Sequence, residues 1–388
     1  MSEKLVRTVV VKLDVKANAP ALMETARRFN AAATWIARVC WNEGITNTNT
    51  AHHRVYGQTR ADYGVGAQLA VCARAKAMEA LKAARRKGGN TCPAWRADAA
   101  VRYDARTYRL LPLDGVSLNT VNGRVTVKML PGQRQRDMLL NTGWLIGGAD
   151  LVQRRGVWYL HLTQHKPAPP SDEPTGYIGV DLGVARIATT DDGATYDGAQ
   201  VKAVRERRFQ HRQRLQKKNT RRSRARLRRV AQREKLFAKD VNHRISKRLV
   251  ATAKDSCKAL ALEDLTGINQ RTAGTVRHEK RRERLSWSFY QLRLCIAYKA
   301  LAAGVSVVYV DPRNTSRECA RCGFTDKRNR RDQAHFLCLS CGHEANADVN
   351  AAKNIAARAE VTQPTVLPLA GLGLGMASTS PRAVAVGC

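Results

Sequence analysis

The sequence predicts a fold of the class α/β plus β: a small β domain with inserted helices, followed by an α/β domain with a metal-binding insertion. Three observations predict this organisation. Four prolines mark the stretch 165–176 as the clearest linker in the chain. Before the linker, one strand pattern, a helical block and a run of strand patterns follow one another, whereas after it strands and helices alternate. Two CxxC pairs interrupt the second part.

The charge of the chain indicates a polyanionic partner. Its 388 residues carry a formal net charge of +35, with an isoelectric point near 10.5, which makes nucleic acid the expected partner. The N-terminal residues lack a long apolar region, and no run of about eighteen apolar residues occurs, so neither a signal peptide nor a membrane partner is expected. Six further cysteines are scattered without a pairing pattern, which favours a reducing, cytoplasmic compartment.

The first part begins with an alternating, β-branched segment at 5–13, which predicts a strand. Apolar residues then recur at three- and four-residue steps over 19–86, which predicts helices. Strand patterns return over 101–163, with turns expected at the Asn-Gly pair 122–123 and at Gly156. A helical domain inserted after the first strand of a β domain therefore explains this part.

The second part begins with the stretch 177–198, which predicts an apolar strand, a second strand and a turn, and Asp181 interrupts the apolar run of the first strand. A carboxylate within a buried strand is costly unless it is paired or binds a cation. A turn-capping role before Gly183 is the alternative. Another buried strand, within 256–268, ends in Glu263 and Asp264, and the strand 305–312 leads into the cysteine motifs.

The stretch 201–250 holds 20 Lys and Arg against 3 Asp and Glu. Its apolar residues keep helical spacing, which predicts two long helices that break near 219–223. A solvated face or a disordered tail is the alternative for such a run, but the amphipathic pattern favours a helix along phosphate backbones. The expected nucleic-acid contacts are Lys217, Lys218, Arg221, Arg222, Arg224 and Arg228.

The region 269–298 contains two predicted segments. The stretch 269–285 is polar and basic and predicts a mobile loop. Trp287, Tyr290, Leu294 and Tyr298 then recur at helical steps and are expected in the core.

Cys319 and Cys322 form the first CxxC pair, and Cys338 and Cys341 form the second, fifteen residues further on. A glycine follows each pair and permits a tight turn around a metal ion. Four thiolates at this spacing suit a tetrahedral, structural Zn²⁺. Two disulfides are the alternative, and the rest of the chain does not support them.

Asp348 follows the second pair, in the first turn of a predicted helix. Taken alone, it is explained as a charge that stabilises the helix dipole. An acid in the first strand, one at the end of a later strand and one on a closing helix is, however, the order of an RNase H-like sheet. There Asp181, Glu263 and Asp348 would converge on two Mg²⁺ or Mn²⁺ ions, which prefer oxygen ligands. Such ions activate a water and stabilise the attacking and leaving oxygens of a phosphodiester.

These motifs resemble a known family. The residues GVDLG around Asp181, LEDL around Glu263, the paired CxxC and DVNAAKNI after Asp348 are similar to the RuvC-type nuclease half of TnpB, an insertion-sequence-encoded RNA-guided endonuclease related to miniature type V CRISPR effectors. The resemblance is specific over 177–358 and weaker before the linker. It implies that the three acids are catalytic, that the four cysteines bind zinc, and that 269–285 is a lid.

The resemblance also implies domain boundaries. We expect a β-barrel-like wedge domain at 1–15 and 101–170, with a helical recognition domain at 16–100 between its parts. A RuvC-like nuclease domain would comprise 176–316 and 345–360, including a basic hairpin at 200–250. A zinc ribbon would occupy 317–344, and the tail 361–388 is expected to be disordered.

The implied partners are a guide RNA from the transposon end, or a CRISPR RNA, and double-stranded target DNA bound by a monomer that acts at the nucleoid of a prokaryotic cell. Three other functions stay open: a miniature CRISPR effector, a DDE-type transposase and a non-catalytic nucleic-acid-binding regulator. Acid spacings of 82 and 85 residues do not exclude the transposase. The regulator would be favoured by a lost acid, and all three are present.

Overall fold

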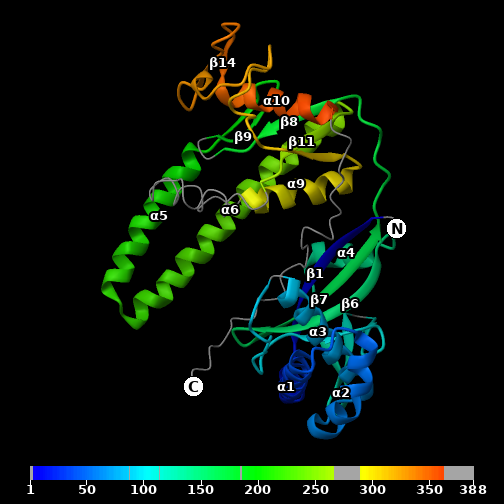
Figure 1. The fold of residues 1–388 in the computed structure, drawn as a ribbon. Helices are drawn as coiled ribbons and strands as arrows, with labels where there is room; N and C mark the ends of the chain where they lie inside the picture. Colours follow the sequence, from blue (N-terminus) through cyan, green and yellow to red (C-terminus); the bar gives the residue numbers. More distant parts are fainter. Residues whose placement is uncertain (1–2, 87, 113, 184–185, 266–288, 362–388) are drawn as a thin grey trace. The chain divides into compact units, whose positions relative to one another are not determined.

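A computed structural model describes residues 3–86, 88–112, 114–183, 186–265 and 289–361 (Figure 1). The chain divides into two compact units, the first ending at Pro167 and the second beginning at Ala168. The expected lid at 269–285, Trp287 and the tail from residue 362 lie outside the described residues. Within the described ranges, no helix is long and apolar enough to cross a membrane.

The first unit contains a seven-stranded sheet with the order β2-β6-β7-β1-β5-β4-β3. The predicted first strand is confirmed as β1, Lys4–Asp14, which pairs antiparallel with both β5 and β7. The other strands are β2 (Val101–Tyr103), β3 (Tyr108–Leu111), β4 (Gly115–Thr120), β5 (Gly123–Leu130), β6 (Leu145–Arg154) and β7 (Val157–Pro167). A strand from one end of the unit therefore lies in the middle of its sheet, between strands that come more than a hundred residues later.

Both predicted turns form, one of them shifted by a residue. Thr120 pairs with Gly123, so the β4–β5 loop consists of Val121 and Asn122 rather than of the Asn-Gly pair. Gly123, with φ of 102°, is the first residue of β5 and takes a conformation that favours glycine. In the β6–β7 turn, Arg155 and Gly156 have φ of 53° and 79°, as a type I′ hairpin requires.

Helices lie between β1 and β2. After a short helical turn, η1 (Lys16–Asn18), come α1 (Ala19–Asn42), α2 (Thr48–Tyr63) and α3 (Ala67–Arg86); a fourth, α4 (Gln133–Leu140), follows β5. The apolar stripe of α1 is buried as predicted, including Leu22, Phe29 and Ile36. These residues belong to the same core as the inner face of the sheet, so the helices and strands of this unit share one core.

The second unit contains a five-stranded sheet with the order β10-β9-β8-β11-β12. Its strands are β8 (Tyr177–Asp181), β9 (Arg186–Thr190), β10 (Thr195–Asp197), β11 (Ala259–Glu263) and β12 (Val307–Val310). The pairs β10–β9 and β9–β8 are antiparallel, whereas the pairs β8–β11 and β11–β12 are parallel. The carboxyl ends of β8 and β11 therefore lie side by side.

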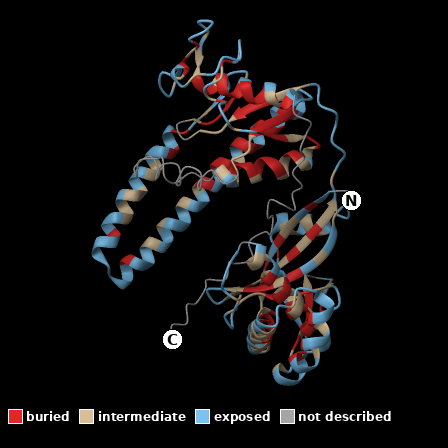
Figure 2. Ribbon diagram, viewed as in Figure 1, coloured by how far each residue is buried: buried red, intermediate tan, exposed pale blue. Residues whose placement is uncertain are grey.

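Helices cover both faces of this sheet (Figures 1 and 2). On one face, Val180 and Leu262 pack in a cluster with Leu249 of α6 (Arg221–Asp255) and Ile296 of α9 (Phe289–Ala303). On the other face, Ala261 and Val308 pack in a cluster with Ile355 of α10 (Ala347–Val361). Since side chains alternate along a strand, every strand residue can be assigned to one of these two faces.

The basic stretch forms the predicted pair of long helices. α5 (Ala199–Lys218) ends at Asn219, whose φ of 42° is left-handed, and the Thr220 side chain then caps α6 by accepting from the Ser223 amide. The break therefore lies within the predicted 219–223. α5 and the first half of α6 expose most of their side chains, and an Arg212–Glu234 ion pair of 2.7 Å joins the two helices.

One predicted core stripe is wrong. Tyr290 of α9 is 58% exposed, and Leu294 and Tyr298 are only half-buried. The neighbouring stripe of Leu292, Ile296 and Ala300 packs on the sheet instead. An aliphatic stripe can be buried without leaving a phenol unpaired, whereas Tyr298 keeps its hydroxyl 3.1 Å from Nδ1 of His243 near the surface.

Candidate functional site

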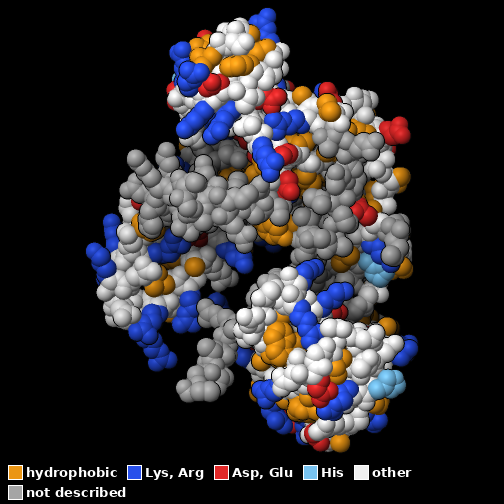
Figure 3. All heavy atoms as spheres, viewed as in Figure 1, with side chains coloured by type: hydrophobic (Ala, Val, Ile, Leu, Met, Phe, Trp, Pro, Cys, Tyr) orange, Lys and Arg blue, Asp and Glu red, His pale blue; other side chains and the backbone are white. Residues whose placement is uncertain are grey.

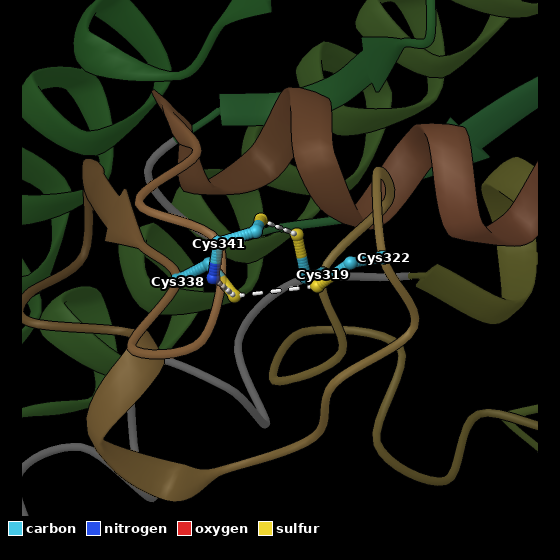
Figure 4. A group of neighbouring side chains, drawn as sticks. All are labelled: Cys319, Cys322, Cys338 and Cys341. Carbon is cyan, nitrogen blue, oxygen red and sulfur yellow. Dashed lines mark hydrogen bonds between the residues drawn. The ribbon is translucent and has the colours of Figure 1, made fainter.

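The four cysteines of the CxxC pairs form one cluster (Figure 4). Their sulfur atoms all lie within 4.8 Å of one another, with 3.7 Å between Cys319 and Cys341 and 3.6 Å between Cys322 and Cys338. Four sulfurs at the corners of so small a space match a tetrahedral metal ion. The cluster could hold a structural zinc ion.

Two matching turns build the cluster. The amide of Gly323 donates to the carbonyl of Cys319 and that of Gly342 to Cys338, and both glycines have positive φ, 72° and 66°. The strands β13 (His335–Leu337) and β14 (Glu344–Asn346) flank the second turn, and β14 leads directly into α10. Burial raises the pKa of the Cys338 thiol, but hydrogen bonds from the amides of Cys341 and Ser340 and from the thiols of Cys322 and Cys341 lower the pKa to about 7. The neighbouring thiols raise the pKa of Cys322 instead, so the thiolate is favoured at Cys338.

Asp181 and Glu263 occupy equivalent places on neighbouring strands. Each is the last residue of its strand, and β8 and β11 are parallel with Val180 opposite Leu262. Because Val180 and Leu262 face α6 and α9, the next residues face α10. The two carboxylates therefore leave one sheet edge on one face.

Asp348, in the first turn of α10, lies at the same edge of the sheet. α10 touches β8 at Gly179, where a Cβ atom would lie 1.9 Å from the carbonyl oxygen of Ala352. Asp348 is one helical turn before Ala352, and Asp181 is two residues beyond Gly179. Asn346 accepts from the amides of Asp348 and Val349 and fixes the start of the helix. Asp348 is 8% exposed.

The electrostatics show that Asp181 senses the other two acids. The pKa of Asp181 is raised to about 7, first by burial and then by the negative charges of Glu263 and Asp348, with Arg330 opposing. Burial also raises the pKa of Glu263, although a hydrogen bond from Thr315 and the charges of Arg358 and Arg330 lower it. A buried carboxylate with a raised pKa is typical of functional sites.

The acids are nevertheless less tightly grouped than the cysteines. Among the described residues, the cysteines form the only group of three or more His, Cys, Asp and Glu side chains placed to hold a metal ion as they stand. Asp348 is paired instead with two guanidinium groups: Arg330 Nη2 lies 3.0 Å from Oδ1, and Arg186 Nη1 lies 3.5 Å from Oδ2. Cationic side chains thus lie beside the acid that would ligate a cation.

Three side chains that contact the acids were not predicted from the sequence. Arg330 comes from the loop between the CxxC pairs, Arg186 from the start of β9, and Thr315 from the loop after β12. Their partners lie 18, 162 and 52 residues away along the chain. No motif spacing links residues so far apart.

The six predicted nucleic-acid contacts lie together on the hairpin. Lys217 and Lys218 end α5, and the four arginines lie in the first turns of α6. All six are exposed, and Lys and Arg side chains mark the visible face of the hairpin (Figure 3). Arg224 donates to the Asn219 side chain at 3.2 Å, which ties one of them to the turn.

The fold is similar to those of compact Cas12-type proteins of known structure. The chain superposes on a Cas12f1 structure solved with its single guide RNA and target DNA, with a TM-score of 0.61, 15% identity and coverage of 88% of this chain and 85% of that one. The chain also superposes on a mini-RNA-guided endonuclease, CRISPR-Cas phi3, with a TM-score of 0.58 and 10% identity, and the match covers 94% of this chain and 93% of that one.

Sequence comparisons find relatives of the same kind. Residues 160–269 match a family described as a probable transposase, OrfB of the IS605 type, and 289–355 match the Cas12f1-like TNB domain. The chain is 34% identical over 245 residues to Cas12f1 of Sulfoacidibacillus thermotolerans, and 31% over 261 residues to InsQ of Escherichia coli K12, a putative RNA-guided DNA endonuclease. These matches cover 58% and 63% of this chain but 56% and 64% of the relatives. The chain is therefore similar to TnpB-like proteins and Cas12f nucleases, and it spans less than two thirds of the length of these two curated relatives.

Proposed function

We propose that the chain is an RNA-guided DNA endonuclease that hydrolyses phosphodiester bonds at Asp181, Glu263 and Asp348. The observation that carries the proposal is that these three acids, from β8, β11 and α10, lie at one edge and one face of the sheet. The names of the relatives, RNA-guided endonucleases and Cas12f1 nucleases, agree with that chemistry. The sheet, with antiparallel strands followed by parallel ones, is proposed to be RNase H-like, as in a RuvC domain.

The donor set fits Mg²⁺ or Mn²⁺. All three groups are carboxylates, and the raised pKa of Asp181 reflects negative charge in a buried setting that a hard cation would relieve. Bound divalent ions would supply an activated water and stabilise the charge on the attacking and leaving oxygens. The chain itself holds Glu263 through Thr315 and presents Arg330 and Arg186 at Asp348.

We propose domains on the same grounds. The first unit would be a wedge domain (1–15 and 101–170) with an inserted recognition domain (16–100), because α1, α2 and α3 interrupt one sheet between β1 and β2. The nuclease domain would comprise 176–316 and 345–360, and the zinc ribbon 317–344, with one structural Zn²⁺ on the four cysteines. The partners would be a guide RNA and double-stranded target DNA, bound by a monomer.

The hairpin residues are proposed to contact phosphates. Replacing Arg222 by glutamine should weaken nucleic-acid binding and reduce the slope of log K against log salt by about 1. Replacing Lys353, an exposed lysine of α10, is the matched control. An unchanged slope for the Arg222 variant would remove that residue from the interface.

The first experiment is to purify the protein from its native locus and sequence the RNA that co-purifies. One discrete RNA ending in a variable segment supports guided targeting and supplies the guide for a cleavage assay. A smear of cellular RNA contradicts guiding. With the guide in hand, Asp181→Ala should reduce cleavage at least about a thousandfold while binding persists, because it removes a metal ligand and no phosphate contact. Asp255→Ala, at the exposed end of α6, is the control; full cleavage by the Asp181 variant contradicts the site.

A second function remains in view because one matching family is described as a probable transposase. A transposase of the DDE type would join DNA strands, whereas the proposed enzyme only cuts them. Joined products in the same assay would favour the transposase. A CRISPR array beside the gene would instead make the chain a miniature type V effector.

A further inference from the structure

We propose that Thr315 is a positioning residue that orients Glu263 for divalent metal binding and links it to the helix that carries Asp348. The inference rests on the proposed function and deepens it. Thr315 lies in the loop between β12 and the first CxxC pair, four residues before Cys319. No sequence motif considered above includes it.

The contact itself is short and buried. The Thr315 hydroxyl donates to Oε1 of Glu263, and the threonine is 2% exposed. Its single proton has a second acceptor within reach, the carbonyl of Pro312 at 3.1 Å, but an ionised carboxylate is the stronger acceptor. One hydrogen bond on Oε1 fixes the rotation of the carboxyl group and leaves lone pairs on Oε2 to ligate a metal ion.

The backbone of Thr315 is fixed as well. Its carbonyl accepts from Nδ2 of Asn354, a buried residue of α10, at 2.9 Å. The same Nδ2 lies 2.7 Å from the carbonyl of Glu318, which also accepts from Asn350 at 2.7 Å. Arg358, one turn further along the helix, donates to the carbonyls of Asp311 and Arg313 at 2.8 and 2.7 Å. One polar side of α10 therefore holds the whole loop.

These contacts form a connected path between two acids. Asp348 begins α10, Asn354 of the same helix holds Thr315, and Thr315 holds Glu263 at the end of β11. Any displacement of the loop would move the hydroxyl away from the carboxylate. Partners that orient a ligating carboxylate typically alter metal affinity by about 10- to 100-fold when removed.

The test is divalent metal binding by the full chain, measured as Mn²⁺ titrated by calorimetry and electron paramagnetic resonance. Thr315→Val removes the hydroxyl at almost constant shape and should weaken Mn²⁺ binding about tenfold. Thr315→Ser keeps the hydroxyl and should stay within about threefold of the parent. Zinc content and thermal unfolding show whether each variant is folded.

A matched control is available in the same unit. Thr190 is 4% exposed and lies opposite Val180, which faces α6 and α9, and its hydroxyl donates to the carboxylate of Asp192, which is not one of the three acids. Thr190→Val therefore deletes a hydroxyl–carboxylate bond of another buried threonine and should leave Mn²⁺ affinity unchanged.

Three outcomes overturn the inference: a Thr315→Val protein that binds Mn²⁺ like the parent, a Thr315→Ser protein that loses affinity equally, or equal losses in Thr190→Val. If Asp181→Ala and Glu263→Ala abolish Mn²⁺ binding while Thr315→Val does not alter it, only the inference fails. If those alanine variants bind Mn²⁺ normally, the proposed active site fails first.

Discussion

The second unit contains two groups of candidate metal ligands, the four cysteines and the three acids, and the two groups differ in how the chain brings them together. The cysteine cluster comes from one stretch of 23 residues and places its sulfurs within 4.8 Å of one another. The acids come from two strands and a helix, and arginines rather than carboxylates are the partners of Asp348. Thiols can be neutral when brought together, whereas ionised carboxylates repel one another. The first site can therefore form by local folding alone, and the second needs the whole sheet and compensating cations.

This difference predicts opposite effects on stability. A structural zinc site contributes folding energy, so losing a ligand should destabilise the protein. A cluster of acids in a buried setting costs stability until a cation arrives, so losing an acid should stabilise the metal-free protein. Three substitutions test the contrast.

The largest effect is expected from Cys338→Ser. It removes a buried sulfur ligand from the cluster, so the protein should lose its zinc. Because the binding energy of a structural zinc contributes to folding, the free energy of unfolding should fall by roughly several kcal/mol. Zinc content by mass spectrometry and thermal unfolding measure both losses. Cys257→Ser, an exposed cysteine outside the cluster, is the control. A variant that unfolds at the parent temperature without zinc would remove the structural role.

A smaller effect of opposite sign is expected from Asp181→Asn. The pKa of Asp181 is about 7 in the folded protein against 3.8 for an ordinary aspartate, so between these pH values the folded chain holds a proton that the unfolded chain has released. Stability of the Mg²⁺-free protein should therefore fall as pH rises from about 4 to about 7. The asparagine variant should lose this slope and gain about 2 kcal/mol at pH 7.5.

Thermal unfolding without added Mg²⁺, across that pH range, is the measurement for Asp181→Asn. Chelators are omitted so that zinc is retained. Added Mg²⁺ should close the gap between variant and parent, because it stabilises only the parent. If the stability of both proteins depends equally on pH, the buried charge of Asp181 does not destabilise the fold.

The smallest effect is expected from Arg186→Gln. The guanidinium is partly exposed and pairs with Asp348 at 3.5 Å, so it competes with a metal ion for the same carboxylate. Its removal should tighten Mn²⁺ binding by two- to fivefold, up to about 1 kcal/mol. Calorimetric titration measures the change, and Arg244→Gln, which breaks an exposed pair with Asp240, is the control. Weaker binding would show that Arg186 supports the site rather than competing for it.

The contrast also explains what could be predicted from the sequence. The spacing of the four cysteines predicts that they form one cluster. The break of the hairpin at Asn219 was predicted from the position at which the helical pattern stops. The acids could be placed in a strand, at a strand end and at a helix start, because hydrophobic patterns define those elements. Glu263 ends β11 as predicted, whereas Asp181, expected within its strand, is the last residue of β8.

The contacts that tune the acids could not be predicted. Arg186, Thr315 and Arg330 contact their partners only in the folded unit. No periodicity of the sequence predicts a contact between residues that are 162 positions apart. The aromatic stripe of α9 failed for a related reason. Tyr290 and Leu292 both belong to regular helical patterns, and packing on the sheet, not periodicity, decided which one was buried.

Gly179 sets a limit on how this chain can be changed. α10 lies so close to β8 there that a single methyl group would overlap the backbone of Ala352 and approach Ala356 N to 2.8 Å. Any other residue would push the helix outward, and Asp348 would move with it while Asp181 stayed in the sheet. In a library of substitutions, position 179 should therefore tolerate no replacement although it has no chemistry of its own. The distance between Asp181 and Asp348 therefore depends on a residue without a side chain. A redesign of the site has to begin with Gly179.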